Sequence, residues 1–271
     1  MKTQQNKTYV IAEGGINHNG NVNYAINLAK SAKQAGCDAI KFQTYITEKR
    51  VGKNSPIFSI LKKCELSFEE FVQIKAYCKS IDIDFLTTAF DEESLNFVCD
   101  ELNIKQIKVA SFDTSNFSFL KKIIKKNITT IISLGMTSIT EINKILKLFK
   151  NKNKLILLHC VSGYPIVDHE ANLSNIHYLK NNFNEIKIGY SDHTKSIEMP
   201  SFAVLAGAKI IEKHFYLSKI RNCPDYPVSL NMKDMTKMIK QIRKSENILG
   251  NPNFNIKNVE KGILQFKRFS K

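Results

Sequence analysis

Ile188-Gly-Tyr-Ser-Asp-His193 and Ile210-Ile-Glu-Lys-His214 are two short apolar runs that each end in a histidine. The histidines are 21 residues apart, a spacing that fits one passage from a strand through a helix to the next strand. If these strands are adjacent and parallel, both imidazoles emerge at the same edge of the sheet, about 5 Å apart. This arrangement predicts a two-histidine site for a divalent metal and favours an enzyme over a binding module. The alternative is that each histidine is an ordinary interior residue.

Similar β-branched runs recur along the whole chain with amphipathic stretches between them. The eight candidate strands are residues 9–12, 39–42, 85–87, 107–109, 130–133, 155–158, 186–188 and 210–211. Helices are predicted over residues 23–35, 71–80, 142–150 and 232–249, and Ser67–Glu70 and Ser138–Glu141 have the spacing of capping boxes. The alternation predicts an α/β protein with a (β/α)8 (TIM) barrel, with a doubly wound sheet as the alternative.

We expect residues 1–250 to form one catalytic barrel domain and residues 251–271 to form a C-terminal tail. The hydrophobic fraction is 43%, which is ample for a core, and no apolar run approaches the ~20 residues of a membrane span. Residues 1–8 are polar and lack the apolar core of a signal peptide, so we expect a cytoplasmic protein. The six cysteines form no Cys-x-x-Cys pair, which is typical of reduced thiols.

The formal net charge of +15 raises the question of nucleic-acid binding. However, the lysines are spread over the whole chain, without a basic tail or an arginine cluster, so we expect no nucleic-acid partner. A positive field would also attract a small anionic substrate. A non-catalytic barrel that binds an anion or a nucleic acid remains the alternative from another functional class.

In a (β/α)8 barrel the active site lies at the C-terminal ends of the strands, and polar side chains are frequent there in this sequence. Lys41 and Lys108 follow apolar residues inside strands, where a bound anion would neutralise them, unless they extend to the rim. Hydroxyl donors that complete such an anion site are Thr88, Ser111, Ser162 and Ser191.

Acidic side chains also lie close to the strand ends. Glu13 and Asp113 are candidates to transfer a proton or to stabilise a developing cation. Asp192 directly precedes His193 and is expected to orient it or to contact the substrate. Asp225 lies in a turn, where an aspartate is usually a local hydrogen-bond acceptor.

Several motifs, in order along residues 9–250, together resemble the sialic acid synthase family. These enzymes condense phosphoenolpyruvate with an N-acyl hexosamine to give a nine-carbon 2-keto-3-deoxy sugar acid and phosphate. The matching segments are Ile11–Gly20, Ala35–Thr44, Lys108–Ser111, Ser133–Thr137, Leu158–Pro165, Gly189–Thr194 and Ile211–Phe215.

The resemblance implies a role for each matching residue. It implies that His193 and His214 bind a divalent metal, usually manganese, and that Lys108 binds the carboxylate of phosphoenolpyruvate. It places Asp113 at the position of the family's catalytic glutamate. Glu13, Gln43 and Asp225 fall where the family contacts the sugar or organises the metal site. The implied contacts to the phosphate of phosphoenolpyruvate are Lys41, Thr88, Ser111, Ser162, Tyr164 and Ser191.

Two departures from the family pattern affect these expectations. The family has Ser-Gly-Glu or Ser-Phe-Glu where this chain has Ser111-Phe-Asp113. The shorter side chain of aspartate retracts the carboxylate by about 1.5 Å, and a misplacement of that size can cost ~100-fold in rate. Phe112 is closer to the pseudaminic branch, so N-acetylmannosamine, the pseudaminic and legionaminic precursors, and another aldose such as a shorter sugar all remain candidate acceptors. The resemblance also implies a homodimer and a C-terminal antifreeze-like domain. Here either a separate polypeptide supplies that domain, or the acceptor is recognised without it, or the activity is altered.

Overall fold

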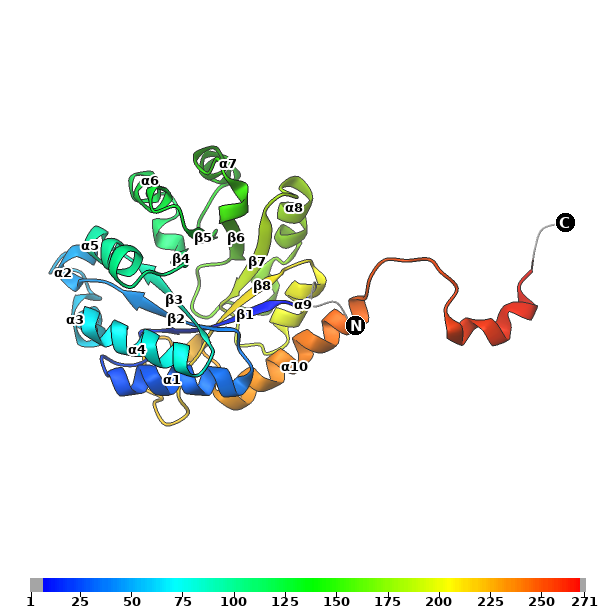
Figure 1. Ribbon diagram of the computed structural model, residues 1–271, viewed down its shortest axis with the longest axis horizontal. Helices are drawn as coiled ribbons and strands as arrows, with labels where there is room; N and C mark the ends of the chain where they lie inside the picture. Colours follow the sequence, from blue (N-terminus) through cyan, green and yellow to red (C-terminus); the bar gives the residue numbers. More distant parts are fainter. Residues whose placement is uncertain (1–6, 269–271) are drawn as a thin grey trace.

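A closed barrel of parallel strands forms the centre of the computed structural model, which describes residues 7–268 (Figure 1). Most of the polar N-terminal segment and the last three residues of the expected tail lie outside the described residues. Neighbouring strands pair in sequence order and β8 closes on β1, which confirms the (β/α)8 prediction. The strands are β1 Tyr9–Gly15, β2 Ala39–Thr44, β3 Asp84–Ala89, β4 Gln106–Val109, β5 Thr129–Ser133, β6 Leu155–Cys160, β7 Lys187–Asp192 and β8 Ile210–His214.

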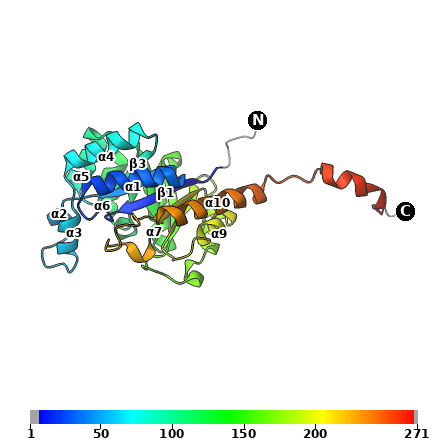
Figure 2. The same ribbon diagram turned by 90° about the horizontal axis from the view of Figure 1, so that it is seen from below.

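Helices surround the barrel and alternate with its strands (Figures 1 and 2). Ser67 and Ser138 form the predicted capping boxes, and their helices begin directly after the caps, three residues earlier than the apolar pattern indicated. The α-helices are α1 Val22–Ala35, α2 Thr47–Arg50, α3 Phe58–Cys64, α4 Phe68–Ser80, α5 Glu92–Asn96, α6 Phe117–Lys125, α7 Ile139–Leu148, α8 Ser174–Asn182, α9 Met199–Leu205 and α10 Met232–Leu249. A π-helical turn spans Phe97–Glu101, and 3-10 turns span Ser111–Asp113, Lys152–Lys154, Asp168–Ala171, Tyr226–Val228 and Asn258–Phe266.

Side chains fill the interior of the barrel in successive layers, because residues two apart on a strand point to the same face. The lower layer is apolar, and its buried members are Ile11, Ala39, Leu86, Ile131, Ile156, Leu158 and Ile210. The next inward positions toward the C-terminal ends carry polar and charged groups, among them Glu13, Lys41, Ser191 and Glu212. The upper layer therefore forms the floor of a polar site.

The outward faces of the strands pack against the helices through one large apolar cluster. Asp192 and Lys213 are exceptions on this face, and both side chains are fully buried. Lys213 Nζ lies 2.6 Å from Asp192 Oδ2, and the Tyr190 hydroxyl donates to the same carboxylate at 3.0 Å. This ion pair links β7 to β8 one residue before His193 and His214.

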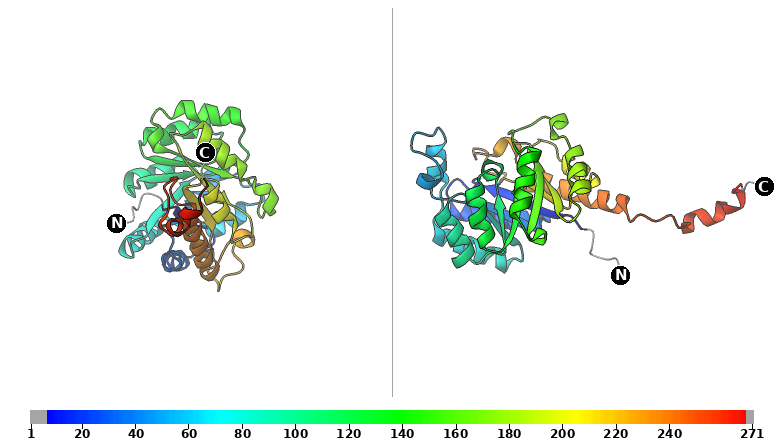
Figure 3. Two further views of the ribbon diagram at one scale, coloured as in Figure 1. Left: turned by 90° about the vertical axis from the view of Figure 1, so that its right-hand side faces the viewer. Right: turned by 90° about the horizontal axis from the view of Figure 1, so that it is seen from above.

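After α10 the chain leaves the barrel. Residues 251–268 run outward as an exposed segment that ends in the 3-10 turn Asn258–Phe266 (Figures 1 and 3). No helix within residues 7–268 is both long and apolar enough to cross a membrane.

Gly189 on β7 has no side chain, and atoms of neighbouring strands occupy the place where one would lie. A Cβ atom at this position would lie 2.5 Å from the carbonyl oxygen of Ile210 and 2.5 Å from Leu158 Cδ2. We predict that Gly189→Ala lowers the free energy of unfolding by about 2 kcal/mol, because the backbone carbonyl of β8 has to move. Gly52→Ala is the control, since nothing lies within 4 Å of its added Cβ. Urea denaturation checks both variants, and equal stability of the two would contradict the prediction.

Candidate active site

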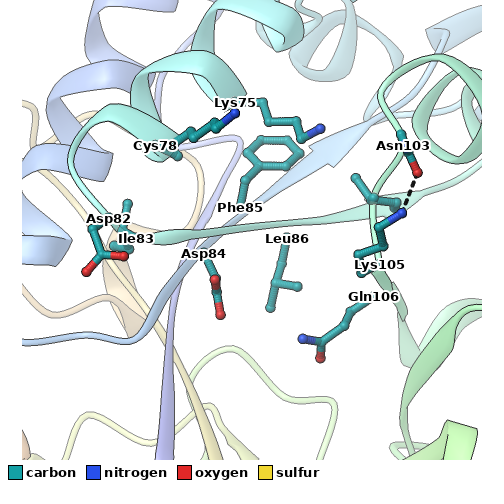
Figure 4. A pocket seen from close by; sticks show the side chains of 12 residues that line it. Lys75, Cys78, Asp82, Ile83, Asp84, Phe85, Leu86, Asn103, Lys105 and Gln106 are labelled. Carbon is teal, nitrogen blue, oxygen red and sulfur yellow. Dashed lines mark hydrogen bonds between the residues drawn. The ribbon is translucent and has the colours of Figure 1, made fainter.

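A polar cavity opens at the C-terminal ends of the strands and brings together most of the residues selected from the sequence. Ten of the fourteen line it, namely Glu13, Lys41, Gln43, Thr88, Lys108, Ser111, Tyr164, Ser191, His193 and His214. Asp113, Ser162 and Asp225 lie around it, and Asp192 lies outside it. A second cavity lies at the opposite end of the strands, between α4 and the beginnings of β3 and β4, where Lys105 donates to Asn103 at 2.7 Å (Figure 4). None of the selected residues lines that cavity.

The floor of the polar cavity is a network of four buried charges. Lys41 Nζ lies 2.6 Å from Glu13 Oε2 and 3.8 Å from Glu212 Oε2. Lys108 Nζ lies 3.6 Å from Glu212 Oε1 and donates to Ser133 Oγ at 2.6 Å. The lysine side chains are 4% and 3% exposed, so the alternative that they extend to the rim is wrong. Carboxylates of β1 and β8 thus compensate the ammonium groups that β2 and β4 place inside.

The two carboxyl groups of this network have different proton affinities. Burial raises the pKa of Glu13, and the negative charge of Glu212 raises it further against the attraction of Lys41. Burial also acts on Glu212, but Lys108 and Lys41 outweigh it and lower the pKa of that carboxyl to about 2. Burial lowers the pKa of Lys108, whereas Glu13 and Glu212 overcome the burial of Lys41 and raise its pKa. Glu212 is therefore the permanent anion of the network.

Hydroxyl groups form one wall of the cavity. A Cβ atom on Gly135 would lie 2.1 Å from Ser162 Oγ and 2.6 Å from Ser111 Oγ, so these two hydroxyls meet over a glycine. Gly135 N donates to Ser111 Oγ at 3.1 Å, whereas Ser162 Oγ is buried without a hydrogen-bond partner among the described residues. Ser191 donates to Glu212 at 3.0 Å and Thr88 accepts from Lys41 at 3.3 Å. The wall offers donors to an anion next to Lys108.

The two predicted metal ligands face one another, with ring centroids 5.4 Å apart. His193 Nδ1 lies 2.7 Å from the carbonyl oxygen of Val161, which requires Nδ1 to carry the proton and leaves Nε2 as the free nitrogen. Burial lowers the pKa of His193 to about 3, so its ring is neutral. Tyr164 packs on the same ring at 4.1 Å between centroids and fixes its orientation.

His214 lies in a more negative environment than His193. Its Nδ1 is buried without a hydrogen-bond partner among the described residues and lies 3.4 Å from Asp225 Oδ2. Burial alone would lower the pKa of His214, but Asp225, Glu13 and Glu212 raise it. These carboxylates favour any cation at this position. The described residues nevertheless contain no group of three or more His, Cys, Asp or Glu side chains arranged to hold a metal.

Asp225 faces the site, whereas Asp192 does not. A Cβ atom on Gly15 would lie 3.0 Å from Asp225 Oδ2, 3.2 Å from Glu13 Oε1 and 3.5 Å from Gln43 Nε2, so these polar atoms converge on Gly15. Asp192 points outward to Lys213, and it neither orients His193 nor reaches the cavity. The expectation for Asp192 is wrong because side chains alternate along a strand, so Asp192 points to the face opposite that of Ser191 and His193.

Asp113 lies in the 3-10 turn Ser111–Asp113 and is half-buried beside the cavity. Burial raises the pKa of its carboxyl, while Asn116 and Arg50 lower it in part. Phe112 is 68% exposed and lines the rim of the cavity. The aspartate is therefore set back from the charged network.

The residues that sequence reasoning missed include Glu212, Arg50 and Cys160, all of which line the cavity. Glu212 had a usable signal, because it lies two residues before His214 on β8 and must share its face. Arg50 had none, because it approaches the cavity from the loop after β2.

A closed (β/α)8 barrel with a buried cationic floor and two opposed imidazoles at its C-terminal face is typical of an enzyme that acts on a small anionic substrate. Residues 28–254 match the NeuB family model, and the chain belongs to this family. This confirms the resemblance that the sequence motifs indicated, and with it the prediction of a synthase-type enzyme.

Characterised and uncharacterised relatives share this barrel. An uncharacterised protein of Methanocaldococcus jannaschii is 41% identical over 245 residues, covering 90% of this chain and 72% of that protein. The N,N'-diacetyllegionaminic acid synthase of Legionella pneumophila is 34% identical, covering 89% of this chain and 73% of that enzyme. The N-acetylneuraminic acid synthetase of Leptospira borgpetersenii, a crystal structure with citrate, superposes with a TM-score of 0.92 at 36% identity, covering 96% and 91% of the two chains.

We predict that Glu212→Gln lowers the free energy of unfolding by about 3 kcal/mol at pH 7, because Lys108 loses its carboxylate partner inside the barrel. The pKa of Glu212 falls from its ordinary value of 4.5 to about 2 on folding. Its contribution is therefore complete above about pH 4.5 and is lost as the pH falls toward 2.

Urea denaturation at pH 7 and pH 3 measures this difference. The control is Glu93→Gln, which removes an exposed carboxylate paired with Lys49 and should have little effect at either pH. A difference between wild type and Glu212→Gln that does not shrink at pH 3 would contradict the assignment.

Proposed function

We propose that the protein condenses phosphoenolpyruvate with an N-acyl hexosamine of the N-acetylmannosamine type, giving a nine-carbon 2-keto-3-deoxy sugar acid and inorganic phosphate. The observation that carries the proposal is the buried pair Lys41 and Lys108 beside the imidazoles of His193 and His214. The NeuB family membership supports the class of reaction, and the names of the relatives support an amino-sugar acceptor.

The cationic floor suits phosphoenolpyruvate because that substrate carries a phosphate and a carboxylate on neighbouring positions. Lys108 and Ser133 would bind the carboxylate, while Lys41 and the hydroxyls of Thr88, Ser111, Ser162 and Ser191 would surround the phosphate. Tyr164, which packs on His193, would close over it. Donors already held by the fold stabilise charge without reorganising during the reaction.

We further propose that His193 and His214 hold a divalent metal, most simply Mn2+, whose other ligands are water or substrate oxygens. The free Nε2 of His193, the buried unpaired Nδ1 of His214 and the carboxylate of Asp225 fit such an ion. When bound, it would supply a Lewis acid that polarises the aldehyde of the open-chain sugar.

In the proposed reaction a carbon–carbon bond forms between C3 of phosphoenolpyruvate and the aldehyde carbon of the acceptor. Positive charge develops at C2, a water adds there, and cleavage of the bond between C2 and the phosphate oxygen releases inorganic phosphate. Asp113 would stabilise the cation or position the water. The former aldehyde oxygen needs a proton to become a hydroxyl, and Glu13, whose pKa is raised, would supply it.

A second acceptor class is supported by the Legionella relative. Its product name contains two acetyl groups on nitrogen, and phosphoenolpyruvate supplies no nitrogen, so both groups must come from the acceptor. A diacetamido hexose is therefore the second candidate, and the pseudaminic precursor has the same chemistry. The structure contains one chain, so the homodimer and the separate antifreeze-like polypeptide stay predictions.

We expect Mn2+-dependent phosphate release from phosphoenolpyruvate only in the presence of an acceptor. A coupled phosphate assay with N-acetylmannosamine, the two diacetamido precursors and unacetylated mannose, with and without chelator, tests this. Release with an acetylated acceptor that stops on chelation would agree with the proposal. Release without any acceptor, or unaffected by chelator, would contradict it.

We expect His193→Ala and His214→Ala each to lower turnover at least 100-fold, because the cavity loses a metal ligand. His177→Ala is the matched control, since this histidine on α8 is exposed, lies outside the cavity and hydrogen-bonds to Asn181. Mn2+ binding measured by calorimetry should be lost in the two cavity variants and kept in the control. Normal Mn2+ binding by His193→Ala would reject the metal assignment.

A further inference from the structure

Arg50 is a cavity residue that none of the roles above uses. It is the last residue of α2, the short helix that follows β2 at the edge of the barrel (Figure 1). Its guanidinium carbon lies 3.6 Å from the ring centroid of Phe90 and 4.7 Å from that of Tyr45. The two aromatic rings hold the planar group in place beside the cavity, since a guanidinium stacks on aromatic faces.

Arg50 fixes the orientation of Gln43. Arg50 Nη1 donates to Gln43 Oε1 at 2.9 Å. A guanidinium has only donors, so the amide of Gln43 must turn its oxygen toward Arg50 and its nitrogen away. The Nε2 group then lies beside Gly15, near the carboxylates of Glu13 and Asp225. Arg50 therefore decides that Gln43 presents an N–H donor to the cavity.

The guanidinium of Arg50 has no ion-pair partner in the described chain. No carboxylate there lies within ion-pair distance of it, and Nη1 is its only side-chain nitrogen with a hydrogen-bond partner among the described residues. Burial lowers the pKa of Arg50, while Tyr45, Asp113, Asp225 and Asp91 raise it in part. A guanidinium with free donors at a cavity wall is suited to binding an oxygen of a ligand.

The position of Arg50 favours a contact with the acceptor rather than with phosphoenolpyruvate. Gln43 lies two residues after Lys41 on β2, so it forms the next layer toward the mouth of the barrel. Lys41 and Lys108 already provide the cations of the floor. Arg50 reaches Gln43 from the loop side, above that floor. Among the uncharged groups of an amino sugar, the amide carbonyl is the strongest hydrogen-bond acceptor.

We propose that Arg50 is a specificity-determining residue that binds the N-acyl carbonyl of the acceptor and holds Gln43 as a donor beside it. This inference rests on the proposed function and names the group by which an acylated amino sugar is distinguished from a plain hexose. Because the guanidinium acts through a fixed fork of donors, a lysine at position 50 does not replace it.

The experiment compares wild type, Arg50→Met and Arg50→Lys in the phosphate-release assay with N-acetylmannosamine and with mannose. We expect both variants to raise the KM for the acylated acceptor about 10- to 100-fold, with the KM for phosphoenolpyruvate changed less than twofold. The kcat/KM for mannose should stay within about threefold of wild type. Lys49→Met is the control, since it removes the neighbouring charge, which pairs with Glu93 on the surface.

Each other outcome rejects the role of Arg50. An unchanged KM for the acceptor would do so. So would a result in which Arg50→Met raises only the KM for phosphoenolpyruvate and Arg50→Lys keeps the wild-type value, because that pattern describes general attraction of an anion. An equal loss with mannose and N-acetylmannosamine would mean a purely structural residue. Absence of wild-type phosphate release with every acceptor would instead reject the proposed function, and this inference with it.

Discussion

The structure depends on the compensation of two ammonium groups that the strands bury inside the barrel. An isolated buried charge costs several kcal/mol, so Lys41 and Lys108 are tolerable only because β1 and β8 place Glu13 and Glu212 beside them. The network fills its own layer of the barrel with charged groups, whereas the layer below it is filled by apolar side chains. Each group is buried and paired before any ligand enters, and an incoming anion meets a floor whose charges are already oriented.

Most of the fold can be predicted from the sequence because local sequence patterns determine it. The β-branched runs, the capping boxes at Ser67 and Ser138 and the regular spacing of strands are short-range signals, and the barrel closure follows from their number. The inward residues of the strands were also accessible, since alternation places Lys41 and Lys108 at the cavity once the strands are known.

The remaining site residues depend on contacts that no local pattern encodes. Arg50 ends the short helix α2 and is positioned by packing on Phe90 and Tyr45, and Asp225 reaches His214 from a turn outside the strands. Asp192 was misjudged because adjacency to His193 in sequence means opposite faces on a strand. Its partner Lys213 is equally adjacent to His214, so the two outward residues pair with each other.

That outward pair has a consequence for the two imidazoles. Because Asp192 and Lys213 tie β7 to β8 on the helix side, the separation of His193 and His214 is set by the sheet. A metal ion of the proposed kind, held between the two rings, would have to accept the separation that the sheet sets. Such a pair would suit ions with short bonds to nitrogen and would disfavour Ca2+, which needs six to eight oxygens at longer range. On the proposed function, the selection of the ion would then be a property of the barrel wall, established when the protein folds.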